Sequence, residues 1–293
     1  METEPLLSQT RKLLRRFNLR ARKGLGQHFL VDGEVLQLIT EAAELTPADT
    51  ILEIGPGLGI LTMELAKQAG RVIAVELDSK LADILKQTMA PFDNVTIINE
   101  NILNIDPATL LPEPKTGFPS TIGPYKVVAN LPYYITSPVL RHFLEAPVKP
   151  KMMLVMVQKE VAEAIVAEPG QRSVLSISVQ FYGKPRIVSY VPARSFYPAP
   201  EVDSALLRID LYLQPAVAVT DIEGFFGLVR AGFTASRKQI VNSLAQGLGL
   251  PKTRVLVLLG SADIAPQRRA ETLTLEEWVQ LWQAFSLSGG ERC

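Results

Sequence analysis

The stretch Glu53-Ile54-Gly55-Pro56-Gly57-Leu58-Gly59 decides the fold of this chain. It joins an apolar run at residues 50–54, which has the pattern of a strand, to residues 60–69, which have the pattern of a helix. Glycines at such a junction let the backbone turn tightly and approach a ligand closely. Glu76 follows Gly55 by twenty-one residues, where a carboxylate can accept hydrogen bonds from ribose hydroxyls. The stretch therefore predicts a strand–turn–helix unit that binds a nucleoside cofactor.

A dinucleotide is the nearest competing ligand for this turn. Two details disfavour it, because the glycines follow the spacing Gly-x-Gly-x-Gly and not Gly-x-Gly-x-x-Gly, and Pro56 removes a backbone N–H donor from any pyrophosphate cradle. S-adenosylmethionine carries no phosphate and suits the turn better. A tight turn without a ligand is the remaining alternative, with Glu53 as a polar strand residue that holds the turn in place.

Around this turn, short apolar segments alternate with helical ones. This alternation predicts an α/β fold with a mostly parallel, doubly wound, Rossmann-like sheet. Two later apolar segments, near residues 186–190 and 205–212, are expected to form an antiparallel edge. The expected strands are residues 50–54, 72–75, 95–98, 125–129 and 152–157, and the expected helices are residues 32–45, 60–69, 80–89, a segment from 137, and 159–166.

A domain boundary is expected at Gln214-Pro215, because only helical patterns follow it. We therefore predict a catalytic domain at residues 1–214, which includes a basic N-terminal arm at 1–27, and a small all-helical C-terminal domain at 215–293. In that domain Thr274 and Glu277 have the spacing of a capping box. The helix after them carries a stripe that we expect in its core: Trp278, Leu281, Trp282 and Phe285.

The tetrapeptide Asn130-Leu131-Pro132-Tyr133 follows the predicted strand at 125–129. The exocyclic amine of adenine is a poor nucleophile, because its lone pair is delocalised into the ring. The Asn130 side-chain oxygen and the Leu131 carbonyl can accept its hydrogens and favour a pyramidal nitrogen, while Pro132 stiffens the loop. Tyr133 offers a face on which a base can stack, and we expect Tyr134 to be core. The loop and the glycine turn together predict methyl transfer from S-adenosylmethionine to a nucleobase nitrogen.

Composition excludes several classes of protein. A hydrophobic content of 47% and a charged content of 20% are typical of a globular chain, and no apolar run approaches the roughly 18 residues of a membrane helix. Cys293 is the one cysteine, and His28 and His142 are the two histidines. We therefore expect no internal disulfide, no metal site and a cytoplasmic location. An Arg-rich start could also be a transit peptide, although Glu2 and Glu4 count against that.

Basic residues gather in two regions of a chain whose net formal charge is zero. A nucleic-acid partner needs such local basic surfaces. For the N-terminal group we favour phosphate binding, because no acidic residue occurs from position 11 to position 31. For the C-terminal group, phosphate binding and ordinary solvated helix faces remain equal alternatives. The first group is Arg11, Lys12, Arg15, Arg16, Arg20, Arg22 and Lys23, and the second is Arg230, Arg237, Lys238, Lys252, Arg254, Arg268 and Arg269.

Five segments together resemble the small-subunit (16S) ribosomal RNA adenine N6,N6-dimethyltransferase family. The resemblance extends from about Arg22 to Asn242 and its motifs are specific. The segments are Gly26-Gln27-His28-Phe29-Leu30, the turn at 53–59, the loop at 130–133, Ser195-Phe196-Tyr197-Pro198-Ala199-Pro200-Glu201-Val202-Asp203-Ser204, and the run from Phe233-Thr234-Ala235-Ser236-Arg237-Lys238 to Asn242.

The resemblance implies particular site residues. Three positions depart from the pattern of the family: His28 stands where Asn is common, Asn101 where Asp is usual, and Ser236 where Arg is expected. Phe196 is expected either to form an aromatic wall over the target base or only to rigidify its loop. The implied cofactor contacts are His28, Leu30, Gly55, Gly57, Glu76, Asn101 and Asn130, and the implied catalytic residues are Asn130, Leu131, Pro132, Tyr133 and Phe196.

The implied activity is dimethylation of N6 on two adjacent adenosines in the 3′-terminal hairpin loop of 16S rRNA, within an assembling 30S particle. We expect a monomer that does not bind membranes. Loop bases are already partly unstacked, so that their extrusion costs little. The alternatives are an antibiotic-resistance methyltransferase that acts on 23S rRNA, a DNA adenine methyltransferase, and a mainly non-catalytic ribosome-assembly factor.

Overall fold

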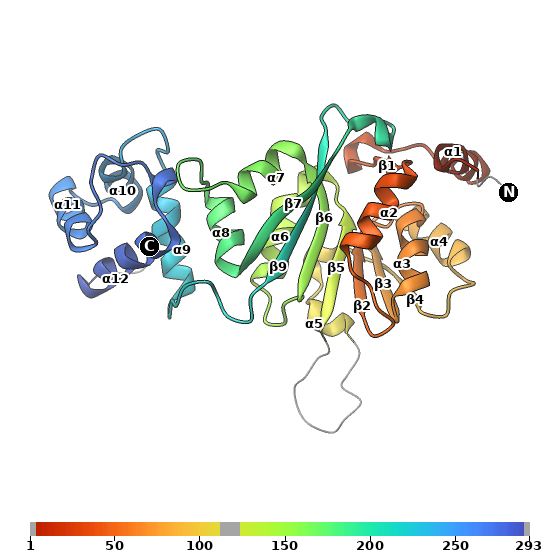
Figure 1. Cartoon of the computed structure of the whole chain (residues 1–293), viewed down its shortest axis with the longest axis horizontal. Helices are drawn as coiled ribbons and strands as arrows, with labels where there is room; N and C mark the ends of the chain where they lie inside the picture. Colours follow the sequence, from red (N-terminus) through yellow and green to blue (C-terminus); the bar gives the residue numbers. More distant parts are fainter. Residues whose placement is uncertain (1–3, 112–123, 290–293) are drawn as a thin grey trace, which may run out of the picture. The chain divides into compact units, whose positions relative to one another are not determined.

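Seven strands form one mixed sheet in the order β4-β3-β2-β5-β6-β9-β7 (Figure 1). The computed structural model describes residues 4–111 and 124–289. Cys293 therefore lies outside the described residues, as does most of the stretch at 109–124, whose Pro and Gly content predicts a surface loop. The first five strands in that order run parallel, and β9 runs antiparallel to β6, which confirms the predicted edge. The strands are β2 (Thr50–Ile54), β3 (Arg71–Glu76), β4 (Val95–Asn99), β5 (Tyr125–Asn130), β6 (Met152–Gln158), β7 (Gly183–Val191) and β9 (Ser204–Leu211).

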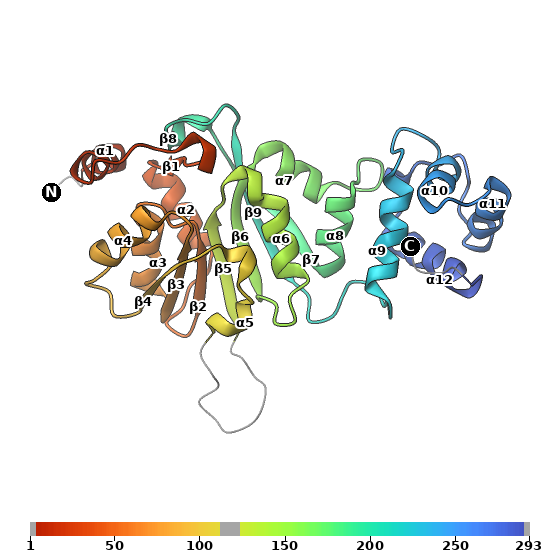
Figure 2. The ribbon, with the colours of Figure 1, turned by 180° about the vertical axis from the view of Figure 1, so that it is seen from behind.

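Helices cover both faces of this sheet. Helices α2 (Gly33–Ala42) and α3 (Ile60–Gln68) pack through a buried cluster that contains Leu36, Leu65 and Val128. Helix α6 (Thr136–Leu144) lies on the opposite face, as the view from behind shows (Figure 2). The other helices of this part are α4 (Ser79–Thr88), α5 (Pro107–Leu110) and α7 (Lys159–Val166).

Two helix starts test the predicted caps. Asp32 caps α2 as its sequence pattern indicated, because its side chain accepts from the N–H groups of Glu34 and Val35. Ser79 precedes the predicted helix at 80–89 and has the residue type of an N-cap, but that expectation is wrong because Ser79 is the first residue of α4. Asp78 takes that role with a side-chain oxygen 3.0 Å from Lys80 N, since an ionised carboxylate is a stronger acceptor for an exposed N–H than a hydroxyl.

The N-terminal segment holds two elements that the sequence analysis did not predict. Helix α1 (Leu6–Arg16) forms part of the basic arm, and its apolar residues Leu6, Leu7, Leu13 and Leu14 recur at helical spacing. A two-residue strand, β1 (Phe29–Leu30), pairs antiparallel with β8 (Phe196–Tyr197), far along the chain. We call the β1–β8 pair the clasp. Beyond it, Val31 N donates to Ser195 O at 2.9 Å and Ser195 Oγ donates to Asp32 Oδ2 at 2.7 Å. Periodicity cannot reveal such a pair, because two residues contain no repeat.

A buried ion cluster fastens the amino-terminal ends of the central strands. Lys126 of β5 lies 3.0 Å from Asp49 Oδ2 and also donates to the carbonyls of Ala43 and Glu44. Lys151 reaches the other Asp49 oxygen at 2.6 Å. Burial alone would raise the pKa of Asp49, but hydrogen bonds from Lys151, Lys126 and Thr46 hold it well below its usual range. The charges of this cluster are therefore compensated where they are buried.

The described chain divides into two compact units, residues 1–162 with 186–211 and residues 163–185 with 212–293. In the second unit an aromatic group of Phe181, Phe225 and Phe226 joins α8 (Val174–Tyr182) to α9 (Ile222–Phe233). The domain boundary predicted at residue 214 stays a prediction. The remaining elements of this unit are α10 (Ile240–Leu248), α11 (Lys252–Ser261), η5 (Ala270–Thr272) and α12 (Leu275–Leu287).

The start and the core of α12 agree with their sequence pattern. Thr274 and Glu277 form the predicted capping box. Trp278, Leu281 and Phe285 are buried, and Trp282 is half-buried. Across the described residues, no helix has the length and apolar character required to span a bilayer.

Candidate active site

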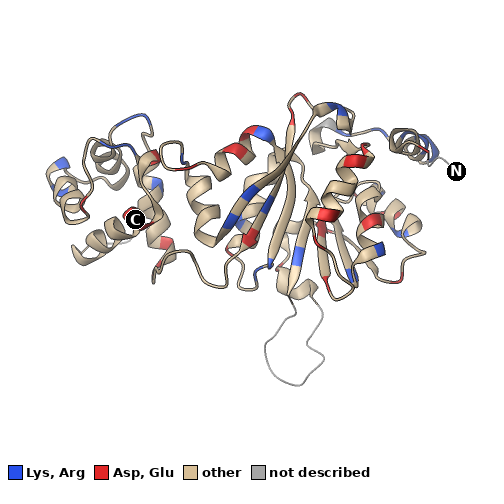
Figure 3. Ribbon diagram, in the orientation of Figure 1, with Lys and Arg blue, Asp and Glu red and all other residues tan. Residues whose placement is uncertain are grey.

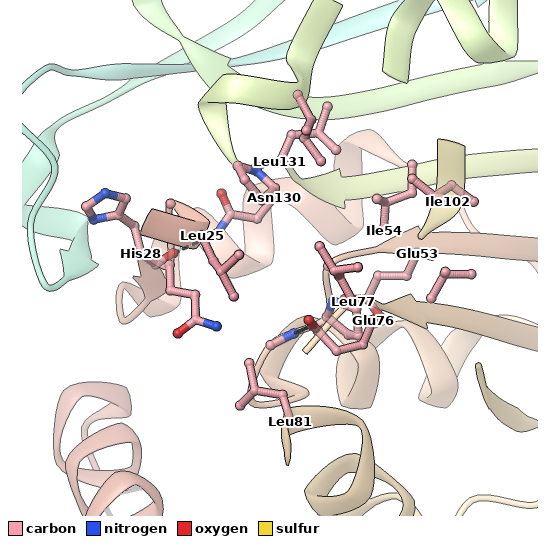
Figure 4. Close-up of a pocket in the computed structure, with 18 of the residues that line it drawn as sticks. Leu25, His28, Glu53, Ile54, Glu76, Leu77, Leu81, Ile102, Asn130 and Leu131 are labelled. Atoms are coloured by element: carbon pink, nitrogen blue, oxygen red, sulfur yellow. Dashed lines mark hydrogen bonds between the residues drawn. The ribbon is translucent and has the colours of Figure 1, made fainter. Parts of the chain in front are cut away.

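A cavity opens at the carboxyl ends of three neighbouring strands. Ile54 ends β2, Glu76 ends β3 and Asn130 ends β5, and all three line the cavity (Figure 4). This is the edge at which open α/β sheets bind ligands. The structure brings ten predicted site residues to its lining: His28, Leu30, Gly55, Gly57, Glu76, Asn101, Asn130, Leu131, Pro132 and Tyr133.

The glycine turn adopts a backbone that other residues rarely tolerate. Gly57 has a φ of 61°, and a Cβ atom there would lie 3.2 Å from the Phe29 ring. Gly59 has a φ of 81°, and its Cβ would lie 2.8 Å from Leu85. Gly55 N donates to Val75 O at 2.9 Å, which ties the turn to β3. Positive φ and close packing together explain why glycine is required at these positions.

Glu76 links the glycine turn to the start of α4. Its Oε2 accepts from Gly57 N at 3.0 Å, and its Oε1 accepts from Asp78 N at 2.9 Å. Burial raises the pKa of the Glu76 carboxyl, and the hydrogen bonds from Asp78 and Gly57 oppose that rise. Each carboxylate oxygen keeps a second lone pair, so Glu76 can still accept hydrogen bonds from a ligand in the cavity.

The orientation of the Asn130 side chain is fixed from the N-terminal segment. Asn130 Nδ2 donates to the main-chain oxygen of His28 at 3.0 Å. Because a carbonyl can only accept, this bond assigns the amide nitrogen and leaves Oδ1 as a free acceptor beside Leu131. Figure 4 shows His28 and Asn130 on one side of the cavity, with Glu76 and Leu77 on the other. Asn130 therefore has an acceptor without a partner among the described residues, on the side of the cavity opposite Glu76.

Tyr133 is held by the two segments that form the clasp. Its hydroxyl lies 2.7 Å from Ser204 Oγ, and its ring stacks on the His28 ring with centroids 6.0 Å apart. His28 Nδ1 lies 2.7 Å from Pro198 O, so this nitrogen carries the proton and donates. Burial raises the pKa of the Tyr133 phenol, which keeps it a neutral hydroxyl. His28, directly before β1, thus contacts both Asn130 and Tyr133.

Pro132 packs between Gly26 of the N-terminal segment and Gly55 of the glycine turn. A Cβ on Gly26 would lie 3.2 Å from Pro132 Cβ, and one on Gly55 would lie 3.7 Å from Pro132 Cδ. Leu131 N donates to Met156 O at 3.3 Å, which fastens the loop to β6. The loop is therefore held by a hydrogen bond at Leu131 and by close packing at Pro132, and the stiffening role of Pro132 stays a prediction.

Of three further residues, one lies differently from what its sequence context indicated. Phe196 does not line the cavity, because it is buried in the core cluster and pairs with Leu30 in the clasp. Its role as an aromatic wall stays a prediction. The assignment of Tyr134 to the core was wrong, since its side chain is 55% exposed and lines the cavity. Asn101 lines the cavity, but its Oδ1 already accepts from Leu103 N at 3.1 Å.

Glu53 is a buried carboxyl in the wall of the cavity. It is 1% exposed, and its Oε2 has no hydrogen-bond partner among the described residues. Burial raises the pKa of Glu53 to about 8, and the nearby Glu76 adds to the rise. The nearby Thr62 hydroxyl lowers this pKa somewhat. It does not meet the geometry of a hydrogen bond to Glu53 Oε2. We expect Glu53 to be protonated at neutral pH in the free protein.

Glu53→Gln is expected to stabilise the fold above neutral pH. The unfolded carboxyl loses its proton near 4.5 and the folded one near 8. Between these values the unfolded chain binds fewer protons, so stability falls as pH rises. At pH 7 the free energy of unfolding is lower by up to about 3 kcal/mol than it is below pH 4.5. Urea unfolding from about pH 5 to about pH 8 should show a flatter stability profile for Glu53→Gln. Parallel profiles for the two proteins would contradict a protonated Glu53.

The cavity residues fit a nucleoside that carries an amino-acid tail. Leu77 and Ile102 add apolar surface next to Glu76, as an adenosine requires (Figure 4). Glu53 Oε2 is a buried acceptor without a partner, which suits a cationic or N–H-bearing group. The residues present therefore fit S-adenosylmethionine. Among the described residues, no group of three or more His, Cys, Asp or Glu side chains could hold a metal ion.

Sequence reasoning missed four contributors to the site: Ser204, Pro198, Leu77 and Ile102. Ser204 and Pro198 both lie in the segment at 195–204 that carries the family resemblance. The motif identified this segment, but it did not indicate that Ser204 would contact Tyr133 or that Pro198 would contact His28. Leu77 directly follows Glu76, and Ile102 follows Asn101. Proximity to a predicted ligand residue was the available signal for both.

The basic residues differ in how far they are already paired. Figure 3 shows Lys and Arg along α1, where Arg11, Arg15 and Arg16 are exposed. In the second unit Arg268 is bound by Glu277 and donates to Thr272 O at 2.6 Å. It therefore holds the start of α12 and is not a free phosphate ligand. Arg237 and Lys238 are exposed, so that both alternatives for this group stay open.

Comparison with known proteins places these features in a family. The sequence profile described as Ribosomal RNA adenine dimethylase matches residues 18–286. A relative from Dehalococcoides mccartyi, named Ribosomal RNA small subunit methyltransferase A, is 51% identical over 97% of this chain and 95% of its own length. A protein of the same name from Moorella thermoacetica is 42% identical over 96% of this chain and 98% of its own.

Two solved structures share the fold. A dimethyladenosine transferase from Plasmodium falciparum superposes with a TM-score of 0.74 at 26% identity, over 89% of this chain and 98% of that one. The 23S rRNA methyltransferase ErmE superposes with a TM-score of 0.67 at 29% identity, over 88% and 99%. With the glycine turn, Glu76 and the oriented Asn130 at one cavity, these matches show that the chain belongs to the ribosomal RNA adenine dimethylase family.

Proposed function

We propose that this protein dimethylates the N6 amine of two adjacent adenosines in the 3′-terminal hairpin loop of 16S rRNA. Family membership makes it an S-adenosylmethionine-dependent rRNA adenine dimethyltransferase. The relatives named for the small ribosomal subunit share up to 51% identity with it over nearly the whole chain. The observation that carries the proposal at the site is the Asn130 amide, whose donor is occupied by His28 and whose acceptor is free.

The residues of this chain prepare the amine and not the methyl donor. Bound S-adenosylmethionine supplies an electrophilic methyl group on a sulfonium. Asn130 Oδ1 and the Leu131 carbonyl accept the two amine hydrogens and draw the nitrogen out of conjugation with the ring. Tyr133 offers a stacking surface for the extruded base. No general base is needed, because the methylated ammonium is acidic and releases its proton to water. Catalysis by this loop is therefore mainly orientation.

The cofactor would be held on the opposite side of the cavity. Glu76 would accept hydrogen bonds from the ribose hydroxyls, and Leu77 and Ile102 would contact the adenine. The close approach of backbone to ligand at Gly55 and Gly57 follows from their positive φ values. The contacts expected at His28, Leu30 and Asn101 complete the proposed cofactor set.

The proposal is tested by substrate choice. Labelled S-adenosylmethionine is incubated with undermethylated 30S particles, 50S particles, free rRNA and DNA, and the modified base is then mapped. We expect label in N6,N6-dimethyladenosine at two adjacent positions of small-subunit rRNA. Label in 50S particles would instead favour the 23S alternative, to which the resemblance with ErmE gives some support. No label in any substrate would favour a non-catalytic assembly factor.

Ser204→Ala is expected to lower kcat about tenfold, the size of one lost hydrogen bond of about 1.4 kcal/mol. The change leaves the Tyr133 hydroxyl without its partner at 2.7 Å and frees the ring to reorient. The affinity for S-adenosylmethionine should not change. Tyr133→Phe removes the same bond, so the double variant should be no slower than either single one. Additive losses in a double-mutant cycle would show that Ser204 does not act through Tyr133.

The partners and location of the protein follow from the same proposal. We propose that it acts on rRNA within an assembling 30S particle, as a cytoplasmic monomer. The exposed cations of α1 and of the C-terminal helices would bind phosphates that flank the target loop. A role in assembly can coexist with catalysis, because binding to a particle requires no turnover.

A further inference from the structure

A second cavity lies between the N-terminal arm and α4. Its volume is about 400 Å³, within the usual range for small-ligand sites. The arm contributes residues 18–22 to its lining, and α4 contributes Lys80 and Leu81. We call this cavity the arm pocket. It shares Gln27, Phe29 and Leu81 with the cofactor cavity, so these side chains separate the two.

The floor of the arm pocket is apolar. Leu14, Phe29 and Leu81 are at most 8% exposed and belong to one buried cluster. Leu19 and Ala21 pack against this cluster from the arm. Because the three cluster side chains are almost fully buried and most of the lining is polar, this small floor suits one face of a flat group with polar edges, such as a nucleobase.

The rim of the arm pocket is cationic. Arg20 and Lys80 are exposed, and neither forms an ion pair with any residue that the structure describes. Asp78 is the one acidic residue in the lining. Its charge is compensated, because Oδ2 lies 3.3 Å from both Arg22 Nη1 and Gln27 Nε2, and Oδ1 accepts from Lys80 N. The rim therefore favours an anion.

We propose that the arm pocket binds one nucleotide of the substrate RNA, with its base on the Leu14–Phe29–Leu81 floor and its phosphate between Arg20 and Lys80. This inference rests on the proposed function for its ligand, and it adds a second nucleotide site next to the catalytic one. RNA is the favoured occupant because the exposed cations of α1 continue the positive rim. Such a site would hold one unstacked nucleotide of the RNA in the arm pocket while another nucleotide is methylated in the catalytic cavity.

Two variants test the proposal through RNA binding, which requires no turnover. Arg20→Gln combined with Lys80→Gln should weaken the affinity for the rRNA hairpin about tenfold and reduce the salt slope by about one phosphate contact. Lys67→Gln combined with Lys86→Gln is the charge control, since it removes the same charge from exposed positions outside the arm pocket, where these lysines pair with Glu64 and Asp83. Fluorescence anisotropy across a salt series measures both quantities.

Ala21→Phe fills the arm pocket without a change in charge, and Ala21 does not line the cofactor cavity. We expect about tenfold weaker RNA binding from the loss of one stacked base. Calorimetric affinity for S-adenosylmethionine should match that of the wild type, which confirms an intact fold. Wild-type RNA affinity in Ala21→Phe would overturn the inference. If adenosine monophosphate binds in the pocket but both variants keep wild-type RNA affinity, the pocket binds a free nucleotide and not the RNA, which would also overturn the inference. Failure of the proposed function would appear separately, as absent methylation by a wild-type protein.

Discussion

Asn130→Ala will lower kcat by about a thousandfold or more, which corresponds to ~4 kcal/mol of transition-state stabilisation. The variant removes the side-chain acceptor that faces the target amine, and it also removes the donor that bonds to His28 O at 3.0 Å. The remaining Leu131 carbonyl cannot hold the amine hydrogens alone. Single-turnover methylation of undermethylated 30S particles measures the chemical step directly.

The binding of the cofactor separates this effect from damage to the cavity. Asn130→Ala should change the dissociation constant of S-adenosylmethionine by less than about fivefold, because Glu76 and the glycine turn remain intact. Asn130→Asp is the informative second variant. It keeps acceptor oxygens but cannot donate to His28 O, so we expect intermediate activity. Unimpaired turnover by Asn130→Ala would refute the role assigned to the loop.

Glu76→Ala will weaken S-adenosylmethionine binding about a hundredfold, or ~2.7 kcal/mol, with a smaller effect on turnover at saturation. The variant removes the acceptor that we propose for the ribose hydroxyls. It also leaves Gly57 N–H and Asp78 N–H without the partners they now have at 3.0 and 2.9 Å. Isothermal calorimetry on the free protein measures the loss.

A modified ligand distinguishes a lost contact from a distorted turn. S-adenosylhomocysteine without its ribose hydroxyls should bind the wild type much more weakly than the normal compound. Glu76→Ala should bind the two compounds almost equally, because the acceptor that tells them apart is absent. If the variant still discriminates between them, the hydroxyls are recognised elsewhere. Equal affinity of the variant and the wild type for S-adenosylmethionine would contradict the role of Glu76 altogether.

The sequence by itself determined the sheet and the places of its candidate ligand residues. Strong periodicity and glycine spacing are local properties, so the turn at 53–59 and the strands that end at Ile54, Glu76 and Asn130 could be predicted. Parallel order then brings those ends to one edge. The same local logic misplaced Tyr134, because the apolar character of a side chain does not tell which side of a loop it occupies.

Only the tertiary structure decided how the site is held. The bond from Asn130 to His28 O joins residues 102 positions apart, and the bond from Tyr133 to Ser204 joins residues 71 apart. The buried carboxyl of Glu53 and the arm pocket have the same origin, since both depend on what packs around them. The local pattern of a chain encodes which groups are present at each strand end. Their orientation, ionisation and burial arise only when distant segments come into contact, because desolvation and hydrogen-bond geometry are properties of the packed surroundings.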